Sequence, residues 1–428
     1  MISNFSEVEK SLKRCLKEKV SITAATVVGF LIAGTVAFGA VTDVTVKGDA
    51  DGTIKITGVK ETTISDSAGK LTVGDILKED TTDPIDSLAG LLTVEVNGTA
   101  AIIKGNYDNQ KETYLGTLSI NSGNEQGVTF LTTNEDYTSI TSDLKVEVTG
   151  QDGKSATAME AANSGDKVTN AGTIAVKDYA LGMVAGAGAT AVNDTNSEIT
   201  VKGENSSVGM SATTVTGSTT TLTNNGKITV TKGTGISVTG DGEAEVAAGE
   251  IEVVAGEVNN IGINIADGTE KTTVTGAKIT LAGAGTGINA GGNVTLENIE
   301  LNFGDNATGT GIVYAGGGTE KETNAEISTR DIDVKASGAT GIDATMSSAK
   351  ESKLTIKTGS ISTGNAGATG IKIAGTELEE LSDGETPTTA TVTTTLGATA
   401  GTGVEVVGAK NNTINVTLQD TQTPTSKT

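Results

Sequence analysis

The sequence predicts an all-β protein that folds as a right-handed parallel β-helix, a solenoid with three short strands in each coil of about 27 residues. Three observations support this fold class. A glycine followed by an apolar residue recurs at nearly regular spacing, apolar and polar residues alternate between these pairs, and aromatic residues make up only 2% of the chain. A thin core shared by stacked coils has little room for aromatic rings, so the composition agrees with the repeat.

The glycine-apolar pair marks one strand of each coil. Its occurrences lie 24 to 33 residues apart, and a period in this range is typical of solenoids. We expect the apolar member of each pair to point inward and to stack on its equivalents in a single ladder. The predicted ladder residues are Met183, Met210, Ile236, Ile263, Ile288, Ile312, Ile342, Ile371 and Val404.

The stretch KGTGISVT at 232–239 contains one of these pairs. Taken alone, its glycines also fit a phosphate-binding loop. The similar stretches GAGTGI at 283–288 and AGATGI at 366–371 indicate instead that it leads into a repeated strand. The glycine is expected to let the chain turn tightly, and Ile236 is expected to enter the core.

Two further strands are predicted in each coil. Triplets such as Ile279-Thr280-Leu281, and pieces such as the one around Val274, alternate as strands with one buried face do. Gly, Asn, Asp and Ser, which favour tight turns, lie between them. The polar or acidic segments 316–324 and 377–389 lengthen two coils, so we expect them to project as loops.

The chain divides into four predicted segments. They are an extended N-terminal signal peptide (1–39), an irregular N-terminal β region with a cap (40–165), regular parallel β-helix repeats (166–408) and a polar C-terminal tail (409–428). The cap is expected at 83–92, where Asp83 and Pro84 favour the start of a short helix, since the first coil of a solenoid needs its open side covered. A separate small β domain is the alternative for 40–165.

The N-terminal segment predicts export. EVEKSLKRCLKEKV at 7–20 is followed at once by the apolar run 20–41, and the small residues of AFG at 37–39 fit a cleavage site near Ala40. A transmembrane anchor is the alternative for the apolar run. This basic segment joined to an apolar run resembles the extended signal region of autotransporter (type V secretion) proteins of Gram-negative bacteria.

The resemblance implies a secreted or cell-surface passenger protein, adhesin-like or structural, that crosses the outer membrane with the help of secretion machinery. Its expected partners are protein or glycan ligands on host or bacterial surfaces. An autotransporter also has a membrane-embedded translocator with aromatic girdles, whereas the last residues QDTQTPTSKT are polar. The chain is therefore expected to be a fragment, a truncated product, or a passenger released or anchored by another protein.

Charge and composition disfavour several classes of function. The net charge of −23 repels nucleic acid and anionic membranes. The chain has no histidine, the residue that general-base and metal chemistry recruits most often, and its only arginines are Arg14 and Arg330. We therefore expect no catalytic constellation, no cofactor, no metal and no membrane insertion by the mature chain.

Two groups of residues are candidate sites. GAGATA at 186–191 matches a dinucleotide-binding fingerprint, but no strand-helix-strand unit is predicted around it. Asp331 and Asp333 should point outward beside Arg330, with Asp343 near in sequence, and paired carboxylates are what glycoside hydrolysis requires. A carbohydrate-active enzyme (a polysaccharide lyase or hydrolase) and a passive surface-coat spacer are thus the alternatives to an adhesin-like passenger.

Overall fold

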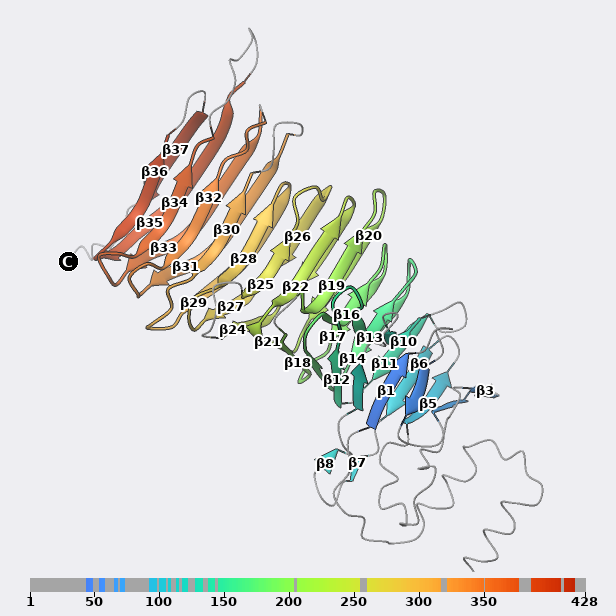
Figure 1. The fold of residues 1–428 in the computed structure, drawn as a ribbon. Helices are drawn as coiled ribbons and strands as arrows, with labels where there is room; N and C mark the ends of the chain where they lie inside the picture. Colours follow the sequence, from blue (N-terminus) through green and yellow to red (C-terminus); the bar gives the residue numbers. More distant parts are fainter. Residues whose placement is uncertain are drawn as a thin grey trace, which may run out of the picture.

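A computed structural model of the chain describes two sets of residues. The first set is 44–48, 54–57, 65–67, 70–73, 92–97, 100–104, 107–108, 113–114, 118–121, 128–133 and 138–142. The second set is 145–203, 206–254, 260–316, 322–349, 351–376, 386–408 and 412–419. These residues form strands and turns with no helix among them, and Figure 1 shows the strands stacked side by side along one long axis.

The predicted fold class is confirmed: the described chain is an all-β parallel solenoid with about 28 residues in each turn. Its first sheet has eleven strands, each paired in parallel with the equivalent strand of the next coil. These strands are β10 (Val128–Thr132), β13 (Ala156–Ala161), β16 (Ala180–Ala185), β19 (Val208–Thr214), β22 (Thr234–Gly240), β25 (Ile261–Ile265), β28 (Thr286–Gly291), β30 (Thr310–Ala315), β32 (Thr340–Thr345), β34 (Thr369–Ala374) and β36 (Thr402–Val407).

Two further rows of parallel strands complete the coils. The second row holds β6 (Ala100–Lys104), β11 (Ser139–Ser142), β14 (Lys167–Asn170), β17 (Thr190–Asn193), β20 (Thr219–Asn224), β23 (Glu243–Ala247) and β26 (Lys271–Thr275). The third row holds β9 (Leu118–Asn121), β12 (Lys145–Thr149), β15 (Thr173–Val176), β18 (Glu198–Lys202), β21 (Lys227–Lys232), β24 (Glu250–Val253) and β27 (Lys278–Leu281).

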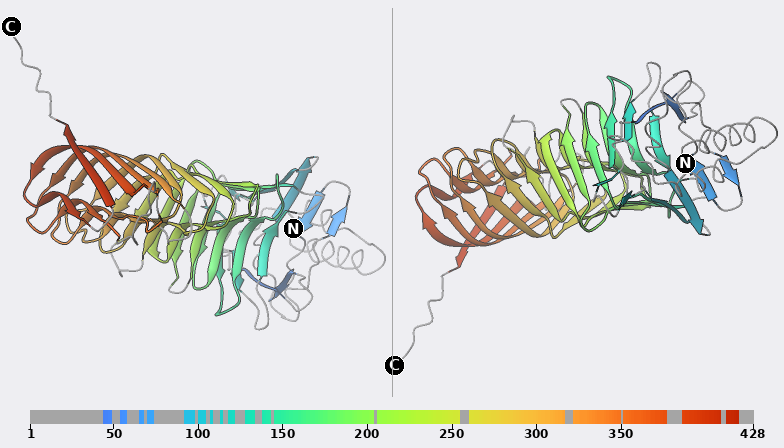
Figure 2. Two further views of the ribbon diagram at one scale, coloured as in Figure 1. Left: turned by 90° about the horizontal axis from the view of Figure 1, so that it is seen from above. Right: turned by 90° about the horizontal axis from the view of Figure 1, so that it is seen from below.

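The second and third rows merge in the later coils. Strand β29 (Val294–Phe303) is long enough to pair with β26 through its first half and with β27 through its second half. The same long strand recurs as β31 (Asn324–Val334), β33 (Lys353–Thr363) and β35 (Thr388–Thr399). Figure 2 shows these longer strands at the C-terminal end of the solenoid.

The N-terminal strands are partly antiparallel. Strand β1 (Val44–Gly48) pairs in parallel with β9 and antiparallel with β2 (Ile54–Thr57). Antiparallel pairs also join β3 (Ser65–Ser67) to β4 (Lys70–Val73), β4 to β5 (Leu92–Asn97), β5 to β6, and β7 (Tyr107–Asp108) to β8 (Thr113–Tyr114). The helix expected at 83–92 falls on residues outside the described ranges, except that Leu92 begins β5.

The regular stack extends past the segment boundaries expected from the sequence. Strands β12 and β13, within 40–165, pair in register with β15 and β16. Residues 412–419, within the segment expected to be a polar tail, form β37 (Asn412–Gln419), which pairs in parallel with β35. These coils lack the glycine-apolar pair that marks the repeat in the sequence: Met159 follows Ala158, and β37 alternates Ile414, Val416 and Leu418 with polar residues.

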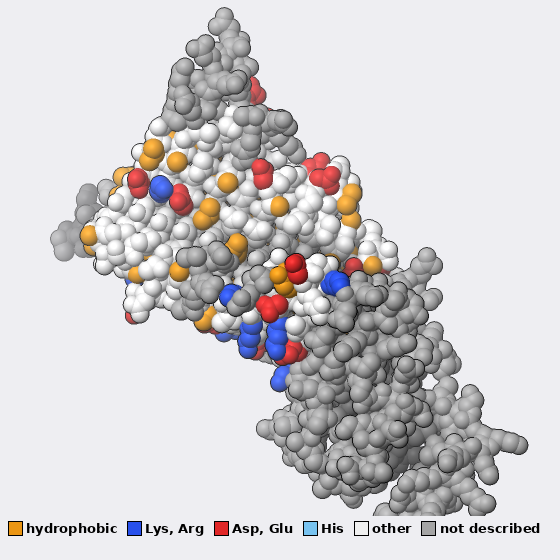
Figure 3. All heavy atoms as spheres, viewed as in Figure 1, with side chains coloured by type: hydrophobic (Ala, Val, Ile, Leu, Met, Phe, Trp, Pro, Cys, Tyr) orange, Lys and Arg blue, Asp and Glu red, His pale blue; other side chains and the backbone are white. Residues whose placement is uncertain are grey.

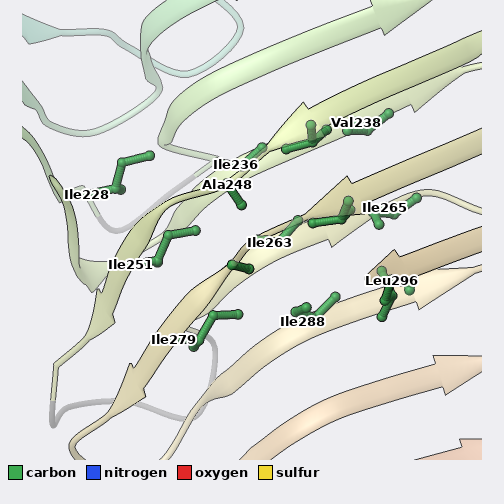
Figure 4. Packing of buried hydrophobic residues seen from close by; sticks show 14 of the residues in the cluster. Ile228, Ile236, Val238, Ala248, Ile251, Ile263, Ile265, Ile279, Ile288 and Leu296 are labelled. Atoms are coloured by element: carbon green, nitrogen blue, oxygen red, sulfur yellow. The ribbon is translucent and has the colours of Figure 1, made fainter. Parts of the chain in front are cut away.

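The nine residues of the predicted ladder lie in one continuous register. Met183 pairs with Met210, Ile288 pairs with Ile312, and the series runs without a break to Val404. All but Val404 are fully buried. Figure 4 shows that Ile236, Ile263 and Ile288 of the first sheet point toward the isoleucines of the third row, so opposite faces share one core. Burying such a side chain contributes about 1.5–3 kcal/mol.

Gly235, in KGTGISVT, serves a different purpose from the expected tight turn. It lies inside β22 and its φ is not positive, whereas Gly233, two residues earlier, has a φ of 112° and makes the turn. A Cβ on Gly235 would lie 2.6 Å from the carbonyl oxygen of Gly262 in the next coil. The repeat glycines from Gly182 to Gly370 thus let the backbones of neighbouring coils approach, since a Cβ on each of them would overlap the carbonyl oxygen of the next repeat glycine.

Replacing Gly235 with alanine should therefore destabilise the fold by about 1–3 kcal/mol, because the new methyl group overlaps the Gly262 carbonyl and must push the coils apart. Chemical denaturation of the two proteins measures this difference. Gly408→Ala is the control, since no atom lies within 4 Å of its Cβ position. Equal losses in both variants would show that the close approach at Gly235 is unimportant.

Replacing Ile312 with aspartate should unfold several adjoining coils, since it buries an unpaired carboxylate at a cost of several kcal/mol between Ile288 and Ile342. Val313→Asp is the control, because Val313 is the next residue of β30 and points outward. Thermal unfolding followed by circular dichroism should show a large loss for Ile312→Asp and a small one for Val313→Asp. A wild-type melting temperature for Ile312→Asp would contradict the ladder.

Candidate functional site

The outward faces of the coils carry the charged side chains, and these follow the coil register. In the third row one outward column alternates in sign over five successive strands, through Glu198, Lys227, Glu250, Lys278 and Glu300. Opposite charges therefore face each other across neighbouring strands, which favours this register over a shifted one. Figure 3 shows one face of the solenoid, with acidic and basic side chains dispersed among uncharged ones.

Ion pairs connect one coil to the next. Lys227 Nζ lies 2.6 Å from Glu252 Oε2, and this hydrogen bond raises the pKa of Lys227, with burial opposing and the charges of Glu252, Glu250 and Glu198 adding to the increase. Five other pairs join coils in the same way: Lys177–Glu147, Arg330–Glu300, Lys335–Asp305, Lys357–Glu326 and Lys372–Asp343. All are partly exposed, so each contributes little alone.

The structure separates Asp343 from the other two aspartates considered as catalytic candidates. Asp331 and Asp333 are exposed on β31, as the alternation predicts, but Asp343 lies on β32 of the first sheet. Asp331 Oδ1 accepts a hydrogen bond from the backbone N–H of Ser360 at 2.7 Å. Asp343 lies 3.6 Å from Lys372.

Asp333 and Arg330, the other two candidate residues, also face residues of adjacent coils. Asp333 stands between the uncharged Asn302 and Ser362 of the adjacent coils. Arg330 donates to Glu300 Oε2 at 3.0 Å. Asp331 and Asp333 thus share the outward face of β31, and Asp343 lies apart from them on the first sheet.

The GAGATA stretch lies where β16 turns into β17. Gly188 has a φ of 73°, and its N–H donates to Thr220 Oγ1 of the next coil at 3.1 Å. Ala189 N–H donates back to the Gly186 carbonyl. These contacts make the stretch a turn between strands, without the helix whose N-terminus would hold a pyrophosphate.

Buried polar residues, which the sequence analysis did not identify, join the coils internally. Asn170 donates to Asn193 and Asn193 donates to Asn224, both at 2.8 Å, and Asn224 closes the series on the Ala248 carbonyl at 2.8 Å. Each asparagine ends its strand next to a turn residue, and this position in the repeat was the available signal. The chain of amides keeps these buried groups hydrogen-bonded.

Asp166 is a second buried polar residue that the sequence analysis missed. Its Oδ2 accepts hydrogen bonds from Thr133 Oγ1 at 2.6 Å and from the backbone and side-chain nitrogens of Asn163 at 3.0 Å. Since β10 ends beside Thr133, this carboxylate holds the turn before β14 against the preceding coil.

Tyr314 is the largest fully buried side chain among the residues that the structure describes. Its hydroxyl donates to the Gly292 carbonyl at 3.0 Å. Burial raises the pKa of Tyr314 to about 12, with a hydrogen bond to Thr323 opposing the change. A raised pKa means that the neutral phenol is stabilised in the folded chain.

The solenoid should therefore lose stability as the pH rises from about 10 to about 12, because the unfolded chain releases the Tyr314 proton before the folded chain does. A shift of about two pKa units corresponds to about 2–3 kcal/mol. Denaturation titrations between pH 9 and 12 should show this loss in the wild type and a smaller one in Tyr314→Phe. Tyr179→Phe, on the surface turn before β16, should behave as the wild type, and identical alkaline curves for all three proteins would refute the assignment.

The fold places the chain in the class of parallel β-solenoid repeat proteins. Comparisons with protein-family models, with curated proteins and with solved structures found no match. Among the described residues, no three His, Cys, Asp or Glu side chains gather as a metal site. A search of the same residues for a helix long and apolar enough to cross a membrane found none.

Proposed function

We propose that the chain is a secreted or surface-displayed passenger of an autotransporter-like system, in which the solenoid acts as an adhesin-like or structural rod. The observation that carries this proposal is the unbroken register of the ladder from Met183 to Val404. A stack of this kind extends along one axis and offers long outward faces to a partner. The resemblance of residues 7–41 to an extended export signal supports delivery to the cell surface.

The contacts of the candidate carboxylates favour binding over catalysis. Hydrolysis of a glycosidic bond needs two carboxyl groups facing one space. Asp331 accepts a hydrogen bond from backbone and Asp343 pairs with Lys372 on another face. Both therefore serve the stack itself.

The charge of the chain limits the proposed partners. A net charge of −23 favours neutral or basic protein and glycan surfaces over nucleic acid or anionic lipid. The mature chain is proposed to remain outside the membrane and to rely on separate secretion machinery. Export is tested by adding a protease to intact cells of the source bacterium: a surface protein is degraded, whereas a cytoplasmic control is preserved.

Binding is tested with the purified chain on immobilised matrix proteins and surface glycans. An adhesin-like passenger gives saturable binding, and a passive spacer gives none on any of these surfaces. The same preparations are assayed for release of reducing ends from pectin and alginate. Turnover that disappears in the double variant Asp331→Asn, Asp333→Asn but persists in Glu322→Gln would overturn the proposal in favour of an enzyme.

A further inference from the structure

The outward face of the first sheet is uncharged over six successive coils. The strands β16, β19, β22, β25, β28 and β30 contain no Asp, Glu, Lys or Arg. Figure 1 shows these strands side by side along the solenoid. In contrast, each of the third-row strands β18, β21, β24 and β27 carries at least one charged residue. We call the outward side of these six strands the neutral face.

Two outward columns of side chains cover the neutral face. The first column runs through Leu181, Val208, Thr234, Ile261, Thr286 and Thr310. The second column runs through Val184, Ser211, Ser237, Asn264, Asn289 and Val313. All are partly exposed except Ser237, which is 9% exposed. Depletion of charge is characteristic of the buried centre of protein interfaces, so the neutral face has the composition of a contact surface.

The second column is complementary to its own reverse. When two copies pack face to face with their solenoids antiparallel, a two-fold axis along the strand direction reverses the order of the coils. With that axis between β22 and β25, the opposed pairs are Val184 with Val313, Ser211 with Asn289, and Ser237 with Asn264. Apolar side chains thus meet apolar ones, and hydroxyls meet amides that can donate and accept hydrogen bonds. A two-fold contact of this kind uses the same surface on both copies.

The charges beyond the neutral face favour the antiparallel arrangement over a parallel one. Glu160 on β13 and Asp343 on β32 are the first charged outward residues on either side of it. A parallel pair centred on the second column places Asp343 of one copy against Asp343 of the other. In the antiparallel pair Asp343 approaches Glu160 of the other copy, and Lys372, 3.6 Å from Asp343, offsets that repulsion.

We propose that the neutral face docks laterally on the neutral face of a second copy of this chain, with the two solenoids antiparallel. Because the chain has a net charge of −23, two copies repel each other through their charged faces and meet without this repulsion at the neutral one. Six strands of about six residues cover about 600 Å². The total of about 1,200 Å² from both copies lies at the lower end of specific interfaces, so the dimer is reversible. This inference is independent of how the chain is exported.

The contact is tested by size-exclusion chromatography with light scattering on the whole chain, which should show a concentration-dependent monomer–dimer equilibrium. Asn264→Glu places a carboxylate from each copy at the centre of the contact and should weaken dimerisation by about tenfold or more. Thr223→Glu is the matched control: it adds the same charge on β20 of the second row, between the uncharged Val192 and Ala247. Both variants should keep the melting temperature of the dilute monomer, because both side chains point outward. A chain that stays monomeric at all concentrations, or a dimer that responds equally to both variants, overturns the proposal.

The orientation is tested by crosslinking single-cysteine chains with a short bismaleimide. The only native cysteine is first removed by Cys15→Ser, and Val184→Cys and Val313→Cys are then made separately in that background. A mixture of the two variants should give a covalent dimer, because these positions lie opposite each other in the antiparallel pair. Either variant alone should give little, since its two thiols lie about 24 Å apart along the stack. Equal crosslinking of a single variant, or none in the mixture at concentrations where the dimer forms, contradicts the antiparallel contact.

Discussion

Neighbouring coils lie one strand spacing apart, about 4.8 Å, and every other feature of the solenoid follows from that distance. Equivalent residues of successive coils lie directly against each other. A residue type that recurs at one position of the repeat must therefore pack well against a copy of itself in the next coil. Isoleucine and valine satisfy this condition inside, since their methyl groups pack in columns. Glycine is required wherever one backbone faces the carbonyl of the next, as Gly235 faces Gly262.

Polar residues must also be compatible with the equivalent residue of the next coil, and the result depends on whether they are amides or charged groups. An amide can both donate and accept, so identical asparagines such as Asn170 and Asn193 can stack while buried. Carboxylates repel their own kind, and the outward column through Glu198, Lys227 and Glu250 alternates in sign. The register is thus specified twice, by the apolar ladders inside and by the charges outside.

The sequence predicted the structure correctly where a recurring residue pattern fits only one local structure. Glycine-isoleucine pairs at a regular period predicted the fold class and the residues that now lie in one ladder, because burial of a lone isoleucine requires like neighbours. The role of Gly235 was not predictable, since the close carbonyl belongs to a residue 27 positions away. The contacts of Asp331 and Asp343 were hidden for the same reason: their partners lie in the following coil.

Inward residues determine the fold of the solenoid, whereas outward residues determine what can bind to it. The fold alone therefore does not identify a ligand. The ladder position of the first sheet keeps Met, Ile or Val from coil to coil. The outward position that follows each ladder residue has no role in the core, and its chemistry varies along the stack. That column runs through Val184, Ser211, Ser237, Asn264, Asn289, Val313, Asp343, Lys372 and Glu405. A ligand lying along this face meets a sequence of polar, apolar and charged groups at fixed spacing, so selectivity can change through outward substitutions while the ladder and the glycines keep the spacing constant.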